Sequence, residues 1–398
     1  MPFRTLIFWT HLAIGIVIGA LVLSMSVTGM LLAFEPQIVD WSERQARTVV
    51  APGPDSRRAG LDAVLANARK ELPDAPPTEI RLWSDPAASI VVKFGKEKGS
   101  LYANPYTGNI IGKDSRIHFF LQSVEDWHRW LASRKIWKPV IDAGNLIFLF
   151  MLVSGLYLWW PRRWTRRALK SVTLPNLKLT GKARDWNWHN AFGFWMAPFL
   201  IVIALTGTIV GYRWASDLVY VLSGNTPPPK APEEAAGSGG KDMRKGPRAQ
   251  ESVADRTPDR AAASLDTMLA QAESKASAWH SIALRLPQKA GAPIIAYIQK
   301  PGFWRRSSRS QLTLNPITAA VVKWEPYSEY NLGRKLRSWV VPIHTGQAGG
   351  ILGQAIVASA AFTAALLVWT GLAISWRRFF QTKPRTRVHA EADARIKV

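Results

Sequence analysis

Four of the seven histidines occupy equivalent positions in two halves of the chain. His11 and His189 each begin an apolar stretch, and each is followed by a glycine at the fourth position and a Thr-Gly pair at the seventeenth and eighteenth. His128 and His344 each precede another glycine by 27 residues. The repeat indicates an internal duplication. Because imidazole groups beside a membrane are costly unless they are used, four equivalent histidines predict a bound cofactor.

The absence of cysteine excludes disulfides and every cofactor or metal site that needs a thiolate. Without thiolates the chain cannot ligate an iron–sulfur cluster or attach a c-type haem covalently. Zinc or copper is the main alternative to haem, but no carboxylate or thiol accompanies the histidines at the spacing of metal ligands. The histidines therefore favour b-type haem, with its iron bound by imidazole on both sides.

The glycines of the repeat lie on the same helix face as the histidines. Gly15 is one turn from His11, and Gly193 is one turn from His189. A glycine at this position removes a side chain from the path of a macrocycle. The two later glycines return to the same face about 27 Å further along, where a second macrocycle could rest. These are Gly29 and Gly207.

The repeat also suggests how the histidines pair. If the two halves are related by a two-fold axis along the membrane normal, equivalent residues face each other. The first histidine pair is then His11 with His189, and the second is His128 with His344. Two bis-histidine haems near opposite membrane faces would follow. A cross-pairing such as His11 with His344 is excluded only by depth in the membrane.

Four apolar stretches of about 20 residues are long enough to cross a bilayer of about 30 Å. They predict an α-helical membrane protein with a four-helix bundle, and the helices are expected at 6–34, 140–160, 191–214 and 350–376. The first is expected to be a retained helix, because no small-residue cleavage site follows a short apolar core. Pro139 and the pair Gly349-Gly350 are expected to bend or break the segments that lead into the second and fourth helices.

The distribution of basic residues predicts the orientation of the helices in the membrane. The connection 161–188 carries eight basic residues and one acid, and the tail 377–398 is also basic. By the positive-inside rule both lie in the cytoplasm with the N-terminus. The segments 35–139 and 215–349 then lie on the outer side of the membrane. This topology explains most of the net charge of +23, so membrane lipid is an expected partner and nucleic acid is not.

Each of these two long segments predicts a small α+β module. An amphipathic helix is followed by three strand-like runs in each, at 79–83, 89–94 and 101–103 in the first segment and at 281–286, 294–299 and 311–314 in the second. An Asn-Pro-x-Thr turn follows in both, with Gly108 after the first and Ala319 after the second, and the first turn leads into 109–112. A module of about 60 residues is only marginally stable alone, so each should pack against the membrane part or against the other module. The segment 223–260 predicts a flexible linker.

Several further residues are candidates for binding. Arg129 and Arg337 lie near the second histidine pair and could clamp haem propionates, with lipid phosphate as the alternative. His118 could flank the same site, whereas His280 is expected to be structural and His389 solvated. The basic run 303–309 could meet an anionic ligand, and an exposed hairpin is the alternative.

The chain resembles the PepSY-associated transmembrane family over nearly its whole length. The motifs that carry the resemblance are His11…Thr28-Gly29, Trp127-His128-Arg129-Trp130-Leu131, Ser154 to Arg163, His189-Asn190-Ala191-Phe192-Gly193, Pro342-Ile343-His344-Thr345-Gly346 and the two turns. The resemblance implies a role in iron–siderophore uptake. Some members are inner-membrane ferric-siderophore reductases that carry b-type haem.

The expected function is therefore that of a di-haem b cytochrome. Electrons would enter at the His11/His189 haem, cross to the His128/His344 haem and reduce a periplasmic ferric siderophore. Because the sequence contains no nicotinamide or flavin motif, the electrons must come from a cytoplasmic partner protein or from quinol. Two alternatives remain open. One is a non-enzymatic accessory protein of iron uptake, and the other is an electron-transfer subunit for a separate reductase.

Overall fold

The computed structural model describes residues 3–53, 56–131, 133–161, 164–229, 263–276, 278–289, 291–302 and 308–380. The chain divides into two compact units. The helical unit comprises Met1–Met30, Pro139–Ala204 and Ala358–Val398, and the sheet unit comprises Leu31–Lys138 and Leu205–Val357. Most of the predicted linker 223–260, the run 303–307 and His389 lie outside the described residues.

Four helices are long and apolar enough to cross a membrane. They are α1 (Phe3–Leu32), α6 (Arg134–Trp159), α8 (Gly181–Gly211) and α12 (Gly350–Phe379). The four predicted spans are thereby confirmed, although α6 and α8 begin earlier than the apolar runs. The early start of α8 has a physical reason, because the polar first turns of this helix bury Asp185 and Asn187 against neighbouring segments.

Small residues let these helices approach closely. A shared core is formed by Leu152 of α6, Leu200 and Ala204 of α8, and Ala360 and Ala364 of α12. Glycines continue the contact, since a Cβ atom on Gly19 of α1 would lie 3.4 Å from Val368 of α12. Between 17 and 28% of each apolar window is buried, so most of its side chains are available to lipid.

The sheet unit is built on one antiparallel sheet of eight strands in the order β4-β3-β2-β1-β5-β6-β7-β8. The strands are β1 (Glu79–Trp83), β2 (Ile90–Lys93), β3 (Ser100–Ala103), β4 (Ile110–Lys113), β5 (Ser281–Arg285), β6 (Ile294–Gln299), β7 (Arg309–Leu314) and β8 (Val321–Glu325). The two predicted modules each contribute four strands and join through β1 and β5, which pair from Glu79↔Arg285 to Trp83↔Ser281. Each module therefore leans on the other.

One strand was missed by sequence reasoning. The run 109–112 indicated β4, but nothing indicated β8, whose first three residues are exposed. β8 is the last strand of the sheet, with a neighbouring strand on one side only. Its residues therefore show no alternation of buried and exposed positions that a sequence pattern could reveal.

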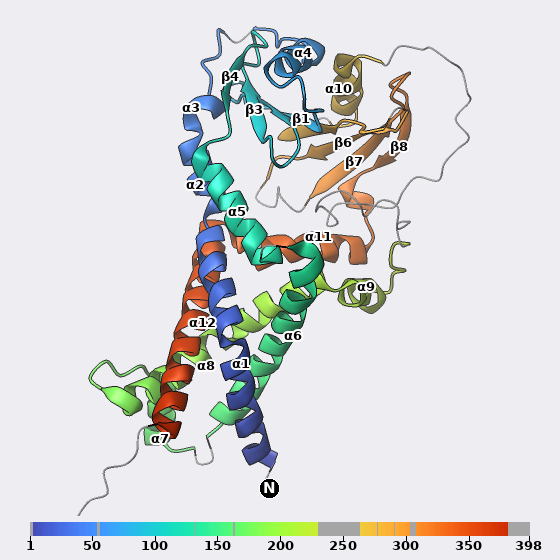
Figure 1. Ribbon diagram of the computed structural model, residues 1–398. Helices are drawn as coiled ribbons and strands as arrows, with labels where there is room; N and C mark the ends of the chain where they lie inside the picture. The colour runs from blue at the N-terminus through green and yellow to red at the C-terminus, as the bar shows by residue number, and fades with distance from the viewer. Residues whose placement is uncertain are drawn as a thin grey trace, which may run out of the picture. The chain divides into compact units, whose positions relative to one another are not determined.

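The hydrophobic core lies between the sheet and two helices, α4 (Leu61–Glu71) and α10 (Leu265–Ser274), which cover the same face (Figure 1). The two helices cap each other. Asp266 accepts a hydrogen bond of 2.6 Å from the backbone N–H of Leu61, and Asp62 accepts one of 3.0 Å from that of Leu265. The first N–H groups of both helices thus find partners in the other half of the unit.

The opposite face of the sheet is the side of α5 (Arg116–Trp130) and α11 (Leu332–His344), which follow β4 and β8 (Figure 1). The remaining helices of this unit are α2 (Glu35–Ser42), α3 (Arg44–Arg47), α9 (Arg213–Leu222), η2 (Tyr327–Glu329) and η3 (Gln347–Gly349). In the helical unit, α7 (Arg166–Thr173) precedes α8 and is held by a 3.0 Å hydrogen bond from Trp159 Nε1 to the Val172 carbonyl.

Pro139 lies inside α6, where it does not break the helix, and a bend there stays a prediction. The break before the second span falls instead at Leu131, whose φ is 44° and which ends α5. In the second half the expectation is confirmed, because α12 starts at Gly350, whose φ is 60°.

The two Asn-Pro-x-Thr turns have the same construction. Asn104 Oδ1 accepts a 2.8 Å hydrogen bond from Tyr106 N, and Asn315 Oδ1 accepts one of 2.8 Å from Ile317 N. The fifth residue is left-handed in both, with φ of 71° at Gly108 and 55° at Ala319. The second turn therefore adopts with alanine a conformation that favours glycine.

We predict that Gly108→Ala lowers the free energy of unfolding by about 1 kcal/mol, since the added Cβ meets only ordinary contacts and the cost is backbone strain alone. Gly95→Ala is the matched control, because Gly95 has no positive φ and a Cβ added there would meet no atom within 4 Å among the described residues. Thermal and denaturant unfolding of the detergent-purified chain would measure both. Equal stability of the two variants would contradict the assignment of strain to the turn.

Candidate functional site

The histidines of the first pair each bond to a hydroxyl on the neighbouring helix. His11 Nδ1 of α1 lies 2.9 Å from Ser154 Oγ of α6. His189 Nδ1 of α8 lies 2.9 Å from Thr370 Oγ1 of α12. The helical unit therefore gives His11 and His189 the same kind of environment, and their pairing with each other stays a prediction.

The hydrogen bonds of the two hydroxyls bear on the imidazole tautomer. Ser154 Oγ also lies 3.1 Å from the Met151 carbonyl, and Thr370 Oγ1 lies 2.8 Å from the Leu366 carbonyl. When a hydroxyl gives its one proton to the carbonyl, its oxygen accepts from the imidazole Nδ1–H. In that arrangement the lone pair of the neutral ring lies on Nε2, the atom that a metal or haem iron would bind.

A glycine follows each of these hydroxyl residues and lies against the imidazole. A Cβ atom on Gly155 would be 3.3 Å from His11 Cε1, and one on Gly371 would be 3.4 Å from His189 Cε1. The hydroxyl orients the ring, and the glycine lets the ring pack against the helix backbone. Sequence reasoning missed the partner role of the hydroxyls. The sequence signal that could have revealed this role is a hydroxyl residue followed by glycine, which recurs in all four apolar spans.

The predicted glycines on the histidine helices face neighbouring side chains. A Cβ atom on Gly15 would lie 3.1 Å from Met151 Cε, and one on Gly193 would lie 3.4 Å from Leu367 Cδ2. Their first role is thus close helix packing. Gly29 and Gly207 are half-buried in α1 and α8. Contact of these four glycines with a macrocycle stays a prediction.

The histidines of the second pair both lie in the sheet unit. His344 ends α11, and its Nδ1 lies 3.1 Å from Thr206 Oγ1, which precedes Gly207. This is a third histidine bonded to a hydroxyl-glycine pair. His128 is half-buried in the last turn of α5. The pairing of His128 with His344 stays a prediction.

The two predicted clamp arginines have different partners. Arg129 forms an ion pair of 3.1 Å with Glu125 and stacks on Trp130. Arg337 is half-buried, and its Nε donates a hydrogen bond of 2.8 Å to Ser216 Oγ. No carboxylate pairs with it among the described residues. Burial lowers the pKa of Arg337. Arg337 is therefore the better placed of the two to receive a carboxylate such as a haem propionate.

A buried ion pair holds the start of α8 one turn before His189. Asp185 is fully buried and accepts hydrogen bonds of 3.0 and 2.9 Å from Arg184. The guanidinium of Arg377, on α12, lies 3.4 Å from the other carboxylate oxygen. A buried charge network of this kind fixes the two helices that carry His189 and its hydroxyl partner Thr370.

A second polar cluster, which sequence reasoning missed, joins α2 and α3 to the start of α5. His118 Nδ1 donates to Glu43 at 2.8 Å and lies 3.3 Å from Asp114. Tyr102 also donates to Glu43, at 2.6 Å. His118 therefore belongs to this cluster, and a position beside the second histidine pair stays a prediction. The partners are up to 75 residues apart along the chain, so no local pattern indicates them.

The donor atoms of Glu43, Asp114 and His118 lie within 4.8 Å of one another, a spacing that could hold a metal ion. The Glu43 carboxylate is nevertheless already satisfied. It accepts two hydrogen bonds from Arg47, at 3.0 and 2.7 Å, and one from the Ser115 N–H at 2.9 Å, in addition to those from His118 and Tyr102. A cation would have to displace these donors. The cluster positions α5, the helix that carries His128.

This environment shifts two pKa values in opposite directions. Hydrogen bonds to Asp114 and Glu43 raise the pKa of His118 from 6.5 to about 9, against the effect of burial. Burial alone would raise the pKa of Glu43, but hydrogen bonds from His118, Tyr102, Ser115 and Arg47 lower it from 4.5 to about 2. His118 is therefore protonated and Glu43 ionised at neutral pH.

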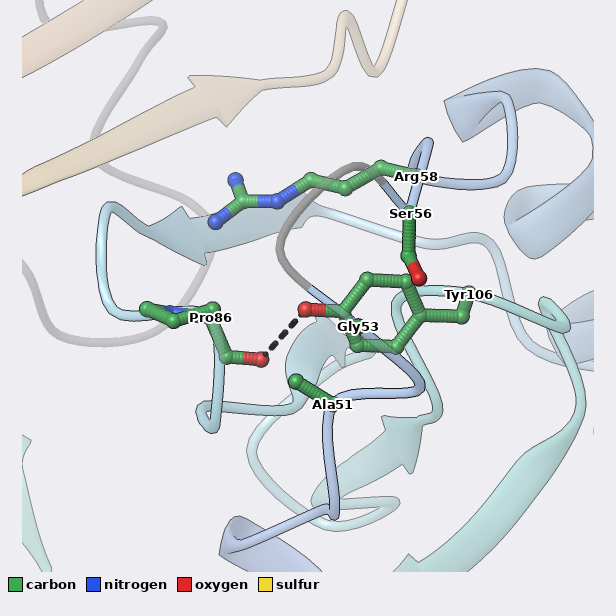
Figure 2. A pocket seen from close by; sticks show the side chains of 6 residues that line it. All are labelled: Ala51, Gly53, Ser56, Arg58, Pro86 and Tyr106. Atoms are coloured by element: carbon green, nitrogen blue, oxygen red, sulfur yellow. Dashed lines mark hydrogen bonds between the residues drawn. The ribbon is translucent and has the colours of Figure 1, made fainter.

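One shallow cavity of about 410 Å³ lies at the edge of the sheet unit and is lined by Ala51, Gly53, Ser56, Arg58, Pro86 and Tyr106 (Figure 2). Its volume would suit a small ligand. Its polar groups are largely used by the protein itself, since the Tyr106 hydroxyl donates to the Pro86 carbonyl at 2.9 Å and Arg58 to the Trp83 carbonyl at 2.7 Å. It is a weaker candidate than the histidine sites.

We predict that stability depends on pH through the Glu43–His118 pair. The His118 contribution is complete below pH 6.5 and is lost as the pH rises through about 9, and the Glu43 contribution is complete above pH 4.5 and is lost as the pH falls through about 2. His118→Gln should flatten the alkaline decline of the unfolding midpoint, whereas His280→Gln should keep it. Parallel alkaline declines in wild type and His118→Gln would contradict the assignment.

Comparison with known proteins agrees with this architecture. Residues 8–378 match the family model described as PepSY-associated TM region, which covers nearly the whole chain. A comparison with curated proteins finds no match. The family match and the four membrane-length helices confirm the resemblance seen in the sequence: the chain is a membrane protein of the PepSY-associated transmembrane family.

Proposed function

We propose that this protein is an inner-membrane di-haem b cytochrome that acts as a ferric-siderophore reductase. It takes electrons from the cytoplasmic side and reduces a periplasmic ferric siderophore, one electron for each Fe(III) converted to Fe(II). His11 with His189 and His128 with His344 are the proposed axial ligands. The N- and C-termini lie in the cytoplasm, and the duplicated modules of the sheet unit lie in the periplasm.

The observation that carries the proposal is the recurrent bond between imidazole Nδ1 and a hydroxyl. His11, His189 and His344 make it, at 2.9, 2.9 and 3.1 Å. For His11 and His189 the hydroxyl also has a backbone carbonyl to donate to, which favours the tautomer with the free lone pair on Nε2. Ligating histidines in metal sites are typically oriented in this way through the other ring nitrogen. A merely structural histidine needs no such repeated arrangement.

The neighbouring residues fit the same group. When bound, b-type haem supplies the one-electron chemistry of iron. Ser154 and Thr370 orient the imidazoles, and Gly155 and Gly371 let the rings pack against α6 and α12. Arg337 offers a guanidinium that has no carboxylate partner among the described residues. The basic connection 161–188 supports the proposed orientation.

Reduction suits a role in iron release. Fe(II) carries less charge than Fe(III), so hard oxygen donors hold it less tightly. The electron donor is either a cytoplasmic protein or membrane quinol, since the sequence contains no nicotinamide or flavin motif.

The primary test is a reduced-minus-oxidised visible spectrum of the detergent-purified protein, with haem quantified as the pyridine haemochrome. We expect a b-type α-band and two haems per chain. His11→Ala and His128→Ala should each remove one haem, and His280→Ala, outside both pairs, should remove none. A colourless protein from haem-sufficient cells would contradict the proposal and favour an accessory role. Reduced protein that ferric siderophore cannot reoxidise would instead indicate an electron-transfer subunit.

A second test addresses the hydroxyl partner. Thr370→Val keeps the side-chain shape but leaves His189 Nδ1–H without its acceptor, so haem affinity should fall by about 10- to 100-fold. The rate of haem transfer to apomyoglobin would measure the loss. Thr363→Val, at a buried threonine of the same helix, is the matched control. Equal haem retention in both variants would show that the hydroxyl does not orient a ligand.

A further inference from the structure

The face of the sheet opposite α4 and α10 carries charged side chains at its centre. Because strand residues alternate between faces, the burial of Ile80 and Leu82 in the core places Glu79 and Arg81 on the opposite face. The register sets Lys93 and Arg285 beside Glu79 on either side. Tyr297 lies on the same face, in register with Ala283, which pairs with Arg81. We call Glu79, Arg81, Lys93, Arg285 and Tyr297 the central polar face.

The central polar face has an excess of positive charge. Its only acid, Glu79, accepts a hydrogen bond of 2.7 Å from Arg81 and lies 3.5 Å from Lys93. Arg285 has no carboxylate partner among the described residues, and its guanidinium lies 5.9 Å from the centre of the Tyr297 ring. The central polar face thus holds three cations and one carboxylate.

Arg81 also has an unused donor. Its side chain is 20% exposed, and its Nε is buried without a hydrogen-bond partner among the described residues. A buried N–H without an acceptor is unfavourable, so an acceptor supplied by a ligand would stabilise the site. Two arginines on the same face of neighbouring strands suit oxygen anions, because each planar guanidinium can bind a carboxylate-like group with two donors.

One row of the sheet links this face to both helices that carry the second histidine pair. The row runs by register from Tyr102 of β3 through Arg81 and Tyr297 to Glu325 of β8. At one end Tyr102 bonds to Glu43, which holds His118 of α5. At the other end Glu325 pairs with Arg334 of α11 at 2.8 Å. The row is therefore anchored at each end to the helix of one histidine.

We propose that the central polar face binds an anionic ferric chelate, with Arg81 and Arg285 as the recognition residues. The inference rests on the proposed reductase function and names the place and charge class of its substrate. Charge complementarity selects a chelate whose carboxylate or catecholate oxygens leave it negative. Glu79 holds Arg81 and Lys93 on the face, and Tyr297 flanks Arg285.

Gallium(III) chelates test binding separately from electron transfer, because gallium(III) resembles iron(III) but is not reduced. Calorimetric titration of the detergent-purified full chain with the anionic gallium(III) catecholate complex should show saturable binding. Arg81→Gln and Arg285→Gln should each weaken it by about tenfold or more, as expected for a lost charged hydrogen bond. Arg69→Gln, an exposed arginine of α4 on the other side of the sheet, should bind as wild type does.

Wild-type protein alone supplies an independent test if a variant fails to fold. The neutral gallium(III) hydroxamate complex should bind at least about tenfold more weakly than the anionic complex. Equal affinity for the two complexes, no binding of the anionic one, or unchanged binding in both arginine variants would overturn the inference. The haem spectrum is recorded on the same samples. Two haems with no anion binding would refute the site and leave the reductase proposal standing, whereas a colourless protein would refute the reductase proposal itself.

Discussion

The hydrogen bond between an imidazole Nδ1 and a hydroxyl on the next helix connects the packing of this protein to its proposed chemistry. It joins α1 to α6 through His11 and Ser154, and α8 to α12 through His189 and Thr370. When the hydroxyl accepts this bond, Nε2 of the neutral ring is left available. The bond requires close helix approach, which the glycine after each hydroxyl permits. Losing the hydroxyl would therefore disturb both the helix contact and the orientation of the imidazole.

In the sheet unit the two four-stranded modules stabilise each other. Their buried residues form one shared core, and β1 of the first module pairs with β5 of the second. Asp62 and Asp266 exchange helix caps across the same seam. The fully buried Met268 and Ile80 come from different modules but share one core. The marginal stability of each small module is thus relieved by pairing with the other module.

Sequence patterns predicted the parts of this molecule that are encoded locally. Hydropathy placed the four membrane helices, and the two Asn-Pro-x-Thr motifs placed their turns, because both depend on residues that are neighbours in the chain. The hydroxyl partners are different, since Ser154 and Thr370 lie 143 and 181 residues from their histidines. Glu43 and His118 likewise meet only in the folded state. The helix stop at Leu131 instead of Pro139 shows tertiary context overriding a local signal.

The seam between β1 and β5 has a consequence for biogenesis. Leu61 N–H and its cap Asp266 lie 205 residues apart, and the membrane helices α6 and α8 lie between the two modules in the chain. While the chain is being synthesised, the first module is complete before β5 exists, so β1 presents an unpaired edge. If α6 and α8 enter the membrane during synthesis, the sheet closes only after their insertion. Correct insertion of the bundle would then be a condition for completing the sheet, and a chain with a misinserted helix would keep an exposed strand edge that quality-control proteases can recognise.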